Sequence, residues 1–315
     1  MPNGSRRDGD AGAARPPVVA VVGPTAAGKS ELSLDLAQRL GGEIVNTDAM
    51  QVYRGMDIGT AKLPPEERRG VPHHLLDLLE VTEPATVAEF QTLARSVVAD
   101  CRARGVTPVL VGGSALYTRA VVDRFEFPGT DDAVRRRLEA ELAEVGPAAM
   151  HERLRSRDPE AAAKVLPSNG RRVVRALEVV EITGRPFAAS LPEPRYFHDR
   201  TVQVGVRIPR PVLDERIEQR VRRMWTDGLV EEVRRLAENG LREGRTASRA
   251  LGYQQVLAFL AGESTEQEAF EATVVGTRRF ARRQDAWFGK DPRVHWVDWD
   301  DPARVDRAIE ACAAG

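Results

Sequence analysis

The sequence predicts an α/β protein, in which helices flank a parallel sheet and a helical insertion interrupts the core. Two observations lead to this prediction. Short runs rich in valine and isoleucine alternate with helical patterns over residues 16–124, which is typical of a parallel sheet. Residues 125–198 then carry helical patterns with few strand signals, and the strand pattern returns after them. At 315 residues the chain is long enough to form two separate cores.

The first part of the chain should contain three buried strands, at 18–23, 43–48 and 107–113. Their β-branched runs are typical of strands that are covered on both faces. Between them, residues 30–40 have apolar side chains at helical spacing, ending at a glycine pair, and residues 86–104 also have a helical pattern. We therefore expect a strand–helix alternation here.

The rest of the chain is mostly helical in pattern. Within the insertion at 125–198 we expect helices at 132–144, 148–153, 159–165 and 171–182. After it we expect a strand at 201–208, helices at 211–227, 230–239, 253–261 and 266–288, and a last strand at 294–299. The predicted domains are a disordered tail at 1–15, an α/β core at 16–124 and 199–315, and the insertion.

Composition narrows the functional classes. The chain is 42% hydrophobic and 30% charged, with a net charge of −1. It has no apolar run near the ~20 residues that a membrane helix needs, and its first residues lack a secretory apolar segment. Cys101 and Cys312 are far apart, which favours neither a disulfide framework nor a cysteine zinc site. We expect a cytoplasmic protein without membrane contacts, acting as a monomer.

The most informative motif is GPTAAGKS, which follows the first predicted strand and opens the first predicted helix. It fits the P-loop pattern, whose backbone N–H groups surround a di- or triphosphate, and it predicts a P-loop NTPase-like sheet. Lys29 would reach phosphate oxygens, Ser30 would place its hydroxyl on a bound Mg²⁺, and Thr25 offers a further hydroxyl. A chance match in a surface turn is the alternative. The predicted diphosphate-binding residues are Gly23, Pro24, Thr25, Ala26, Ala27, Gly28, Lys29 and Ser30.

Asp48 ends the second predicted strand, and the carboxyl ends of parallel strands lie at the ligand-binding edge of such a sheet. It has three interpretations: a Mg²⁺ ligand, a general base, or a helix N-cap. Gln51 lies three residues further, and a Gln amide can pair with the edge of adenine. A carboxylate and an amide at this spacing suggest that they hold an adenine between them.

Two other polar positions carry weaker signals. Ser114 follows two glycines at the end of a predicted strand, where it would either contact substrate or cap the next helix. His73 and His74 are adjacent, so their side chains point in different directions and are unsuited to binding one metal ion together.

Four arginine clusters remain, within 135–137, 171–178, 215–224 and 277–288. The last interleaves its arginines with Phe280, Trp287 and Phe288. A solvated helix face with glutamate partners is the ordinary explanation for any one cluster. Four clusters together favour a polyanionic partner such as RNA.

These residues resemble the bacterial tRNA dimethylallyltransferase (tRNA isopentenyltransferase) family, over nearly the whole chain from about Val18 to Trp299. The resemblance rests on motifs in a specific order: GPTAAGKS, DAMQVYRGMDIGTAK, PHHLLD, VGGSALY, RRVVRALEV, RALGYQQ and TRRFARRQDAWF. It implies transfer of a dimethylallyl group from dimethylallyl diphosphate to the exocyclic amine of the tRNA adenosine immediately 3′ of the anticodon, with release of pyrophosphate.

The resemblance also implies roles for individual residues. Asp48 would be the general base, and Thr25, Lys29, Arg220 and a Mg²⁺ ion on Ser30 would stabilise the leaving pyrophosphate. The implied tRNA contacts, centred on the anticodon stem-loop, are Asp48, Ala49, Met50, Gln51, Ser114, Arg135, Arg171, Arg172, Arg175, Arg249, Gly252, Tyr253 and Gln254. The family often has Ser at the position of Ala49 and Thr at that of Ser114, so the first of these hydroxyl contacts is not required.

Two alternatives stay open from the sequence. A small-molecule P-loop kinase would use the same nucleotide-binding loop on ATP, but it leaves Asp48–Lys62 and the arginine clusters unexplained. A non-catalytic RNA-binding protein explains the arginines but not the P-loop.

Overall fold

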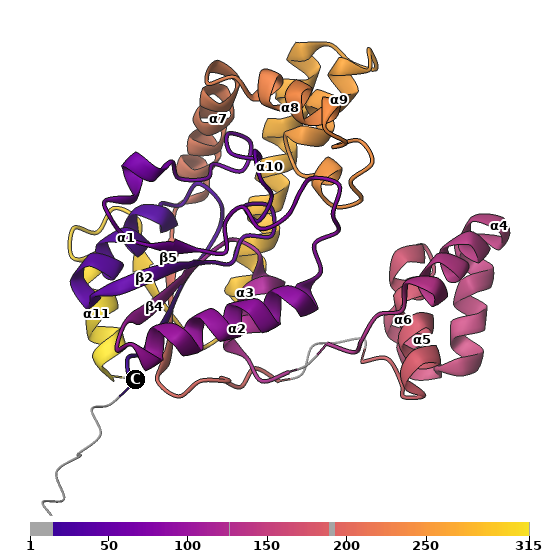
Figure 1. Ribbon diagram of the computed structural model, residues 1–315, viewed down its shortest axis with the longest axis horizontal. Helices are drawn as coiled ribbons and strands as arrows, with labels where there is room; N and C mark the ends of the chain where they lie inside the picture. Colours follow the sequence, from indigo (N-terminus) through magenta and orange to yellow (C-terminus); the bar gives the residue numbers. More distant parts are fainter. Residues whose placement is uncertain (1–14, 126, 189–192, 315) are drawn as a thin grey trace, which may run out of the picture. The chain divides into compact units, whose positions relative to one another are not determined.

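The structure of the protein is a computed structural model that describes residues 15–125, 127–188 and 193–314 (Figure 1). Contacts divide the chain into two compact units, one comprising residues 1–123 and 196–315 and the other residues 124–195. The sequence placed the boundaries of the insertion at 125 and 198. The tail predicted at 1–15 lies outside the described residues, except for Arg15.

The described residues of the first unit form a sheet of six parallel strands in the order β3-β2-β4-β1-β5-β6. The strands are β1 (Val18–Val22), β2 (Gly42–Asn46), β3 (His73–His74), β4 (Thr107–Val111), β5 (Thr201–Arg207) and β6 (Val294–Asp298). The α/β class with a parallel sheet is therefore confirmed. Only the two-residue β3 was not predicted, because it is too short to carry a hydrophobic pattern.

Both faces of the sheet are buried, and β1 shows this most clearly. Val18, Ala20 and Val22 face one hydrophobic cluster, while Val19 and Val21 face another. Side chains alternate between the faces of a strand, so a continuous apolar run is needed when helices cover both sides. The VVAVV sequence of β1 meets this requirement and fixes the start of the phosphate loop at the centre of the sheet.

Helices cover these two faces (Figure 1). One face packs against α1 (Lys29–Leu40) and α11 (Arg304–Ala314), and the other against α2 (Val87–Ala103) and α3 (Ala115–Val122). The remaining helices of this unit are α7 (Arg210–Thr226), α8 (Leu229–Glu238), α9 (Tyr253–Leu260) and α10 (Glu266–Phe288), with short 3₁₀ turns at Pro65–Arg68 and Ala247–Arg249. Helices α3 and α11 were not predicted from the sequence. Within the described part of the chain, no helix combines the length and the apolar character required to cross a bilayer.

The second unit is helical throughout its regular structure. It consists of α4 (Asp132–Arg157), α5 (Pro159–Lys164) and α6 (Gly170–Thr183) around its own hydrophobic cluster, which includes Leu138 and Leu154. Gly146 has φ 79° and ψ 167°, and Pro147 follows it, so α4 is interrupted there. This break lies between the two helices that the sequence predicted at 132–144 and 148–153.

We predict that Leu110→Ala destabilises the first unit by about 3 kcal/mol, because it removes a fully buried side chain from the central sheet and leaves a cavity. Urea denaturation followed by circular dichroism measures this change. Leu93→Ala is the control, since Leu93 on α2 is 50% exposed and its truncation should cost less than ~0.5 kcal/mol. Equal effects of the two substitutions would contradict the assigned core.

Candidate functional site

Three loops meet at the carboxyl edge of the sheet. They follow β1, β2 and β4, and in the sheet β4 lies between β1 and β2. The chain passes from β1 to β2 and only later inserts β4 between them, which makes this edge a topological switch point. The loops are joined there, since the Thr47 N–H donates to the Val111 carbonyl at 2.8 Å.

The loop after β1 has the backbone conformation that its glycines allow. Gly28 has φ 97° and lies immediately before α1, in the left-handed region that favours glycine. At Gly23, φ is 131°, and a Cβ would lie 3.1 Å from the Val206 carbonyl oxygen on β5. The loop therefore runs close to the neighbouring strand and delivers the N-terminus of α1, with its partial positive charge, to the switch point.

Lys29 lines a cavity of about 610 Å³ together with Ser30 and the arginines Arg216, Arg220 and Arg223. Its Nζ donates to the Pro24 carbonyl at 2.8 Å. Burial, aided by the charge of Arg220, lowers the pKa of Lys29 to about 7, against the opposing effect of Asp48. A second cavity, of about 390 Å³, shares Arg216, Arg220 and Arg223 and extends to Trp299.

Arg220 joins α7 to the phosphate loop, because its guanidinium donates to the Thr25 hydroxyl at 3.1 Å. Burial and the neighbouring charges of Arg216 and Arg223 lower the pKa of Arg220. The three arginines are spaced so that they share one face of α7. Cations that repel one another around a cavity favour an anionic ligand, which would relieve both the repulsion and the loss of hydration.

Asp48 lies in the loop after β2 and is held from both sides. Its backbone N–H donates to Asn46 Oδ1 at 2.8 Å, and its carboxylate accepts from the Met50 N–H at 2.9 Å. Burial raises the pKa of Asp48, and this rise is opposed by hydrogen bonds from the Met50 and Gln51 N–H groups and by the charges of Lys29 and Arg220. No helix begins at residues 48–51, so the helix N-cap interpretation is wrong. The carboxylate is a half-buried proton acceptor whose pKa is also affected by the charges of Lys29 and Arg220.

The side chain of Gln51 points into its own loop. Its Nε2 donates to the carbonyls of Thr60 and Ala61 at 3.1 and 3.4 Å. The sequence suggested that this amide and the Asp48 carboxylate hold an adenine between them. In the structure, the NH₂ group of Gln51 instead donates within the loop, so it does not face an adenine together with Asp48. The predicted pairing is wrong for this structure.

The loop at 48–62 rests on two buried charged groups that the sequence analysis did not identify. Lys62 forms ion pairs with Asp57 and Asp77, both at 2.6 Å. Glu232 on α8 accepts from the Ile58 N–H at 2.8 Å and from the Tyr253 hydroxyl at 2.5 Å. The sequence signal that could have indicated this support is Lys62, a charged residue within the DAMQVYRGMDIGTAK motif. A charged side chain that is buried needs a partner of opposite charge.

Tyr253 is therefore a supporting residue. Its side chain is fully buried, and Gly252 is buried beside it. An RNA contact through the Tyr253 side chain was expected from the family resemblance, and burial excludes it in this structure. By contrast, Arg249 and Gln254 in the same segment are exposed.

Ser114 follows the glycine pair after β4 and connects that loop to Asp48. Its hydroxyl accepts from the Ala49 N–H at 3.3 Å, and it makes no capping bond to α3, although it occupies the N-cap position. A Cβ at Gly112 would lie 2.4 Å from Thr47 Oγ1, so the glycine permits this close approach. The capping role considered for the Ser114 side chain is absent, and the hydroxyl instead positions the Asp48 loop.

The arginines of the second unit divide into two classes. Arg135 and Arg175 both form ion pairs with the fully buried Glu178, at 2.7 and 2.9 Å. The two arginines keep the buried Glu178 carboxylate paired, and this leaves less of each guanidinium for a partner than the sequence suggested. Arg171 and Arg172 are exposed at the N-terminal end of α6.

The arginine cluster on α10 shows the same division. Arg278 forms an ion pair with Glu218 at 2.9 Å. Arg279, Arg282 and Arg283 are exposed, and Arg283 lies over the ring of Phe280 at 5.7 Å. The exposed arginines keep the surface charge that the sequence analysis assigned to a polyanionic partner.

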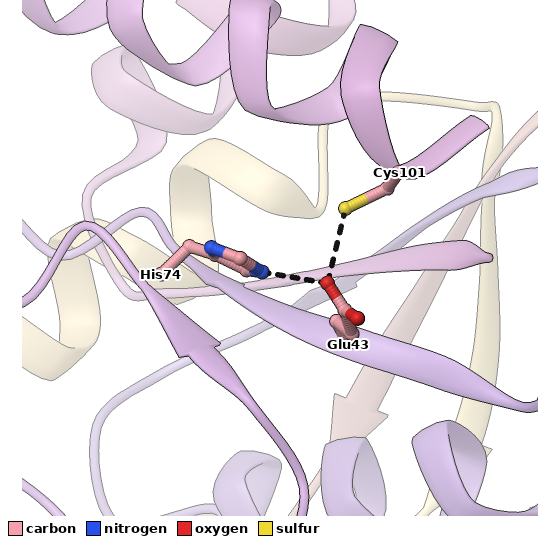
Figure 2. A group of neighbouring side chains, drawn as sticks. All are labelled: Glu43, His74 and Cys101. Atoms are coloured by element: carbon pink, nitrogen blue, oxygen red, sulfur yellow. Dashed lines mark hydrogen bonds and ion pairs between the residues drawn. The ribbon is translucent and has the colours of Figure 1, made fainter. Parts of the chain in front are cut away.

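One cluster with metal-binding residue types lies elsewhere, where Glu43, His74 and Cys101 point toward one another (Figure 2). Glu43 accepts from His74 Nε2 at 2.7 Å, and the Arg104 guanidinium donates to both Glu43 oxygens at 2.9 and 2.7 Å. The Arg104 bonds lower the pKa of Glu43 to about 2, while burial raises that of the Cys101 thiol to about 11. Arg104 supplies the positive charge that pairs with Glu43, so the contacts in this structure are those of an ion-pair cluster.

Comparison with known proteins agrees with this geometry. A family model described as IPP transferase matches residues 51–291. A tRNA dimethylallyltransferase from a Nocardioides species is 69% identical over 300 residues, covering 95% of this chain and 97% of that protein. The tRNA dimethylallyltransferase of Thermobifida fusca is 64% identical over 299 residues, covering 93% of each.

Solved structures show the same similarity. The tRNA isopentenylpyrophosphate transferase of Bacillus halodurans has a TM-score of 0.68 at 40% identity, covering 95% of each chain. A eukaryotic dimethylallyltransferase acting on tRNA has a TM-score of 0.79 at 26% identity, covering 95% of this chain and 77% of that one.

We predict that pyrophosphate affinity falls as the pH rises above about 7, because a pKa of about 7 means that the Lys29 cation is lost over this range. Binding then requires proton uptake, and the affinity should fall by up to about tenfold per pH unit. Isothermal titration calorimetry in buffers of different ionisation enthalpy measures both the affinity and the proton uptake.

Lys29→Arg is the control for this measurement, because its guanidinium stays charged throughout the range. Its affinity for pyrophosphate should lack the decline, apart from changes due to the ligand's own ionisation. Parallel pH curves for Lys29→Arg and the unsubstituted protein would contradict the lowered pKa.

Proposed function

The chain belongs to the IPP transferase family, and we propose that it transfers a dimethylallyl group from dimethylallyl diphosphate to a tRNA adenosine, releasing pyrophosphate. The acceptor in this proposal is the exocyclic amine of the adenosine immediately 3′ of the anticodon. The family predicted from the sequence motifs is confirmed, and the kinase alternative finds no support. The observation that carries the proposal is that Lys29 and Arg220 line one cavity and Arg220 donates to Thr25 of the phosphate loop, while Asp48 lies near enough for both charges to affect its pKa.

The donor half of the reaction follows from the cations of this loop. Lys29 and Arg220, with the N–H groups at the start of α1, would hold the diphosphate through its oxygens. As the bond between the allylic carbon and the diphosphate oxygen breaks, negative charge grows on the departing oxygen. Preorganised donors stabilise that charge, and each is worth about 3–4 kcal/mol in comparable sites.

The acceptor half follows from Asp48. The adenine amine is a weak nucleophile because its lone pair is delocalised into the ring. As the nitrogen bonds to the allylic carbon, its proton passes to the Asp48 carboxylate, so proton removal and charge development are balanced. Burial raises the pKa of Asp48, which makes the carboxylate a stronger base than a free aspartate, and the charges of Lys29 and Arg220 oppose this rise.

We further propose that the donor binds with Mg²⁺. Ser30 lines the cavity beside Lys29, and its hydroxyl is the kind of hard oxygen donor that Mg²⁺ accepts alongside phosphate oxygens and waters. Bound there, the ion would neutralise charge on the leaving pyrophosphate.

For the RNA, we propose that the exposed arginines supply phosphate contacts. They include Arg279 and Arg283 on α10, Arg249 near α9, and Arg171 and Arg172 in the helical unit. The target base must leave its stack to reach the half-buried Asp48 carboxylate, at a cost of a few kcal/mol that phosphate contacts offset. We also propose that the protein acts as a monomer in the cytoplasm, and light scattering with and without an anticodon stem-loop tests the oligomeric state.

The direct test uses dimethylallyl diphosphate with a radiolabel in the prenyl group, together with tRNA made by transcription and therefore unmodified. The proposal predicts label on the RNA and one pyrophosphate released per prenyl group. A parallel reaction with ATP should transfer no phosphate. ATP turnover without label on the RNA would contradict the proposal.

We predict that Asp48→Asn lowers the single-turnover rate by about 10²- to 10⁴-fold, because the amide keeps the size of the side chain but cannot accept the proton. Affinity for tRNA, measured by filter binding, should change less than about twofold. An unchanged rate would remove Asp48 from the role of base.

The pH dependence provides the matched control for this assignment. The neutral, protonated Asp48 is inactive as a base, so the rate should fall as the pH drops through its raised pKa. In Asp48→Asn the residual rate should lack this decline. A similar decline in both proteins would mean that another group controls it.

We predict that combined Arg279→Ala and Arg283→Ala substitutions weaken tRNA binding most at low salt and reduce the slope of log affinity against log salt by about 1.5 to 2. Both side chains are exposed on α10. The control is Arg307→Ala on α11, because Arg307 is exposed but forms an ion pair with Asp301 at 2.7 Å. An unchanged slope in the double variant would identify the α10 arginines as a solvated face.

A further inference from the structure

Gln284 on α10 bridges two of the three loops at the switch point. Its Oε1 accepts from the Thr25 N–H at 2.8 Å, and its Nε2 donates to the Gly113 carbonyl at 2.8 Å. The residue is only 4% exposed, and its contacts lie 259 and 171 positions away in the chain. A buried amide with both polar ends satisfied is rigid, because breaking either bond would leave an unpaired group.

The space around this bridge is closed on the Gly113 side. A Cβ at Gly113 would lie 2.1 Å from Gln284 Nε2, so only glycine leaves room for the amide. Each glycine of the pair after β4 is thus required for a separate steric reason. Gly112 leaves room for Thr47, and Gly113 leaves room for Gln284. Neither reason involves a ligand, although the pair appears in the sequence as a generic strand-to-helix turn.

Both ends of the bridge lead to groups that the proposed reaction uses. At one end, the Thr25 hydroxyl accepts from Arg220. At the other end, Ser114 follows Gly113 directly and accepts from the Ala49 N–H, one residue from Asp48. The Gln284 amide therefore lies on a continuous path of hydrogen bonds and backbone between the diphosphate side and the base side.

We propose that Gln284 is a positioning residue that fixes the separation between the phosphate loop and the Asp48 loop, and so aligns the prenyl carbon with the amine that attacks it. The inference rests on the proposed function and deepens it. Glutamine suits this role because the bridge needs an acceptor toward Thr25 and a donor toward Gly113. A small shift between reacting groups lowers a rate steeply, by about 100-fold for ~1 Å.

The first test is Gln284→Met, which keeps the length of the side chain but removes both hydrogen bonds. We expect the single-turnover rate with saturating substrates to fall by about 30- to 100-fold, while the affinity for tRNA changes less than about twofold. The matched control is Gln267→Met on the same helix, where the glutamine is exposed and donates to Glu271, and the rate of this variant should stay unchanged. A Gln284→Met rate within about twofold of that of the unsubstituted protein would overturn the inference.

The second test separates positioning from a merely structural role. In Gln284→Glu, an ionised carboxylate presents an acceptor to the Gly113 carbonyl, whereas a protonated carboxyl restores one acceptor and one donor. The ratio of the variant's rate to that of the unsubstituted protein should therefore rise about tenfold as the pH falls from 8 to 5.5, independently of the titration of Asp48, which affects both.

A ratio that does not depend on pH would overturn the inference. Label transfer by the unsubstituted protein in the same assay tests the proposed function by itself. The two conclusions thus fail in different ways: loss of all transfer in the unsubstituted protein rejects the function, whereas a normal reference rate with an insensitive Gln284 rejects only the positioning role.

Discussion

The crowding of positive charge at one cavity is the constraint on which the rest of the site depends. Lys29, Arg216, Arg220 and Arg223 line the same space at the start of α1. Burial and the repulsion of neighbouring cations lower the pKa of Lys29 and of Arg220, so gathering these cations costs free energy that an anionic ligand would offset. The rest of the fold must offset this unfavourable free energy. The packed sheet and the hydrogen bonds that hold the loops do so.

Asp48 is the residue that distinguishes this site from a general anion-binding site. A phosphate loop alone serves many reactions, and cations alone only bind an anion. In the proposed reaction, the half-buried Asp48 carboxylate, whose pKa is affected by the charges of Lys29 and Arg220, would supply a proton acceptor close to the diphosphate. In this proposal the cations bind the leaving group and Asp48 accepts the proton. The negative charge of Asp48 and the positive charge of Lys29 each favour the ionised form of the other group.

Much of this arrangement could be predicted from the sequence. The apolar run of β1 followed by GPTAAGKS predicted both the central strand and the phosphate loop. Asp48 could be placed at the same edge of the sheet because the carboxyl ends of parallel strands lie together. The motif resemblance identified the family. These features are local in the chain, or follow from one topological rule.

What the sequence could not predict are contacts between distant residues. Glu232 and Gln284 support the loops from helices far along the chain, and no periodic pattern distinguishes them from surface residues of the same type. Tyr253 was assigned to RNA from its motif, but it is buried against Glu232. Arg135 and Arg175 looked like free cations because the burial of Glu178 depends on how α4 packs on α6.

The central claim is that the phosphate loop holds a leaving group rather than a group being transferred. Dimethylallyl diphosphate carrying ¹⁸O in the oxygen that bridges carbon and phosphorus tests this most directly. If the carbon–oxygen bond breaks, mass spectrometry will find the ¹⁸O in the released pyrophosphate while the prenyl group is on the RNA. If the isotope stays with dimethylallyl alcohol and phosphorus appears on the RNA, the phosphorus–oxygen bond has broken and the account is wrong.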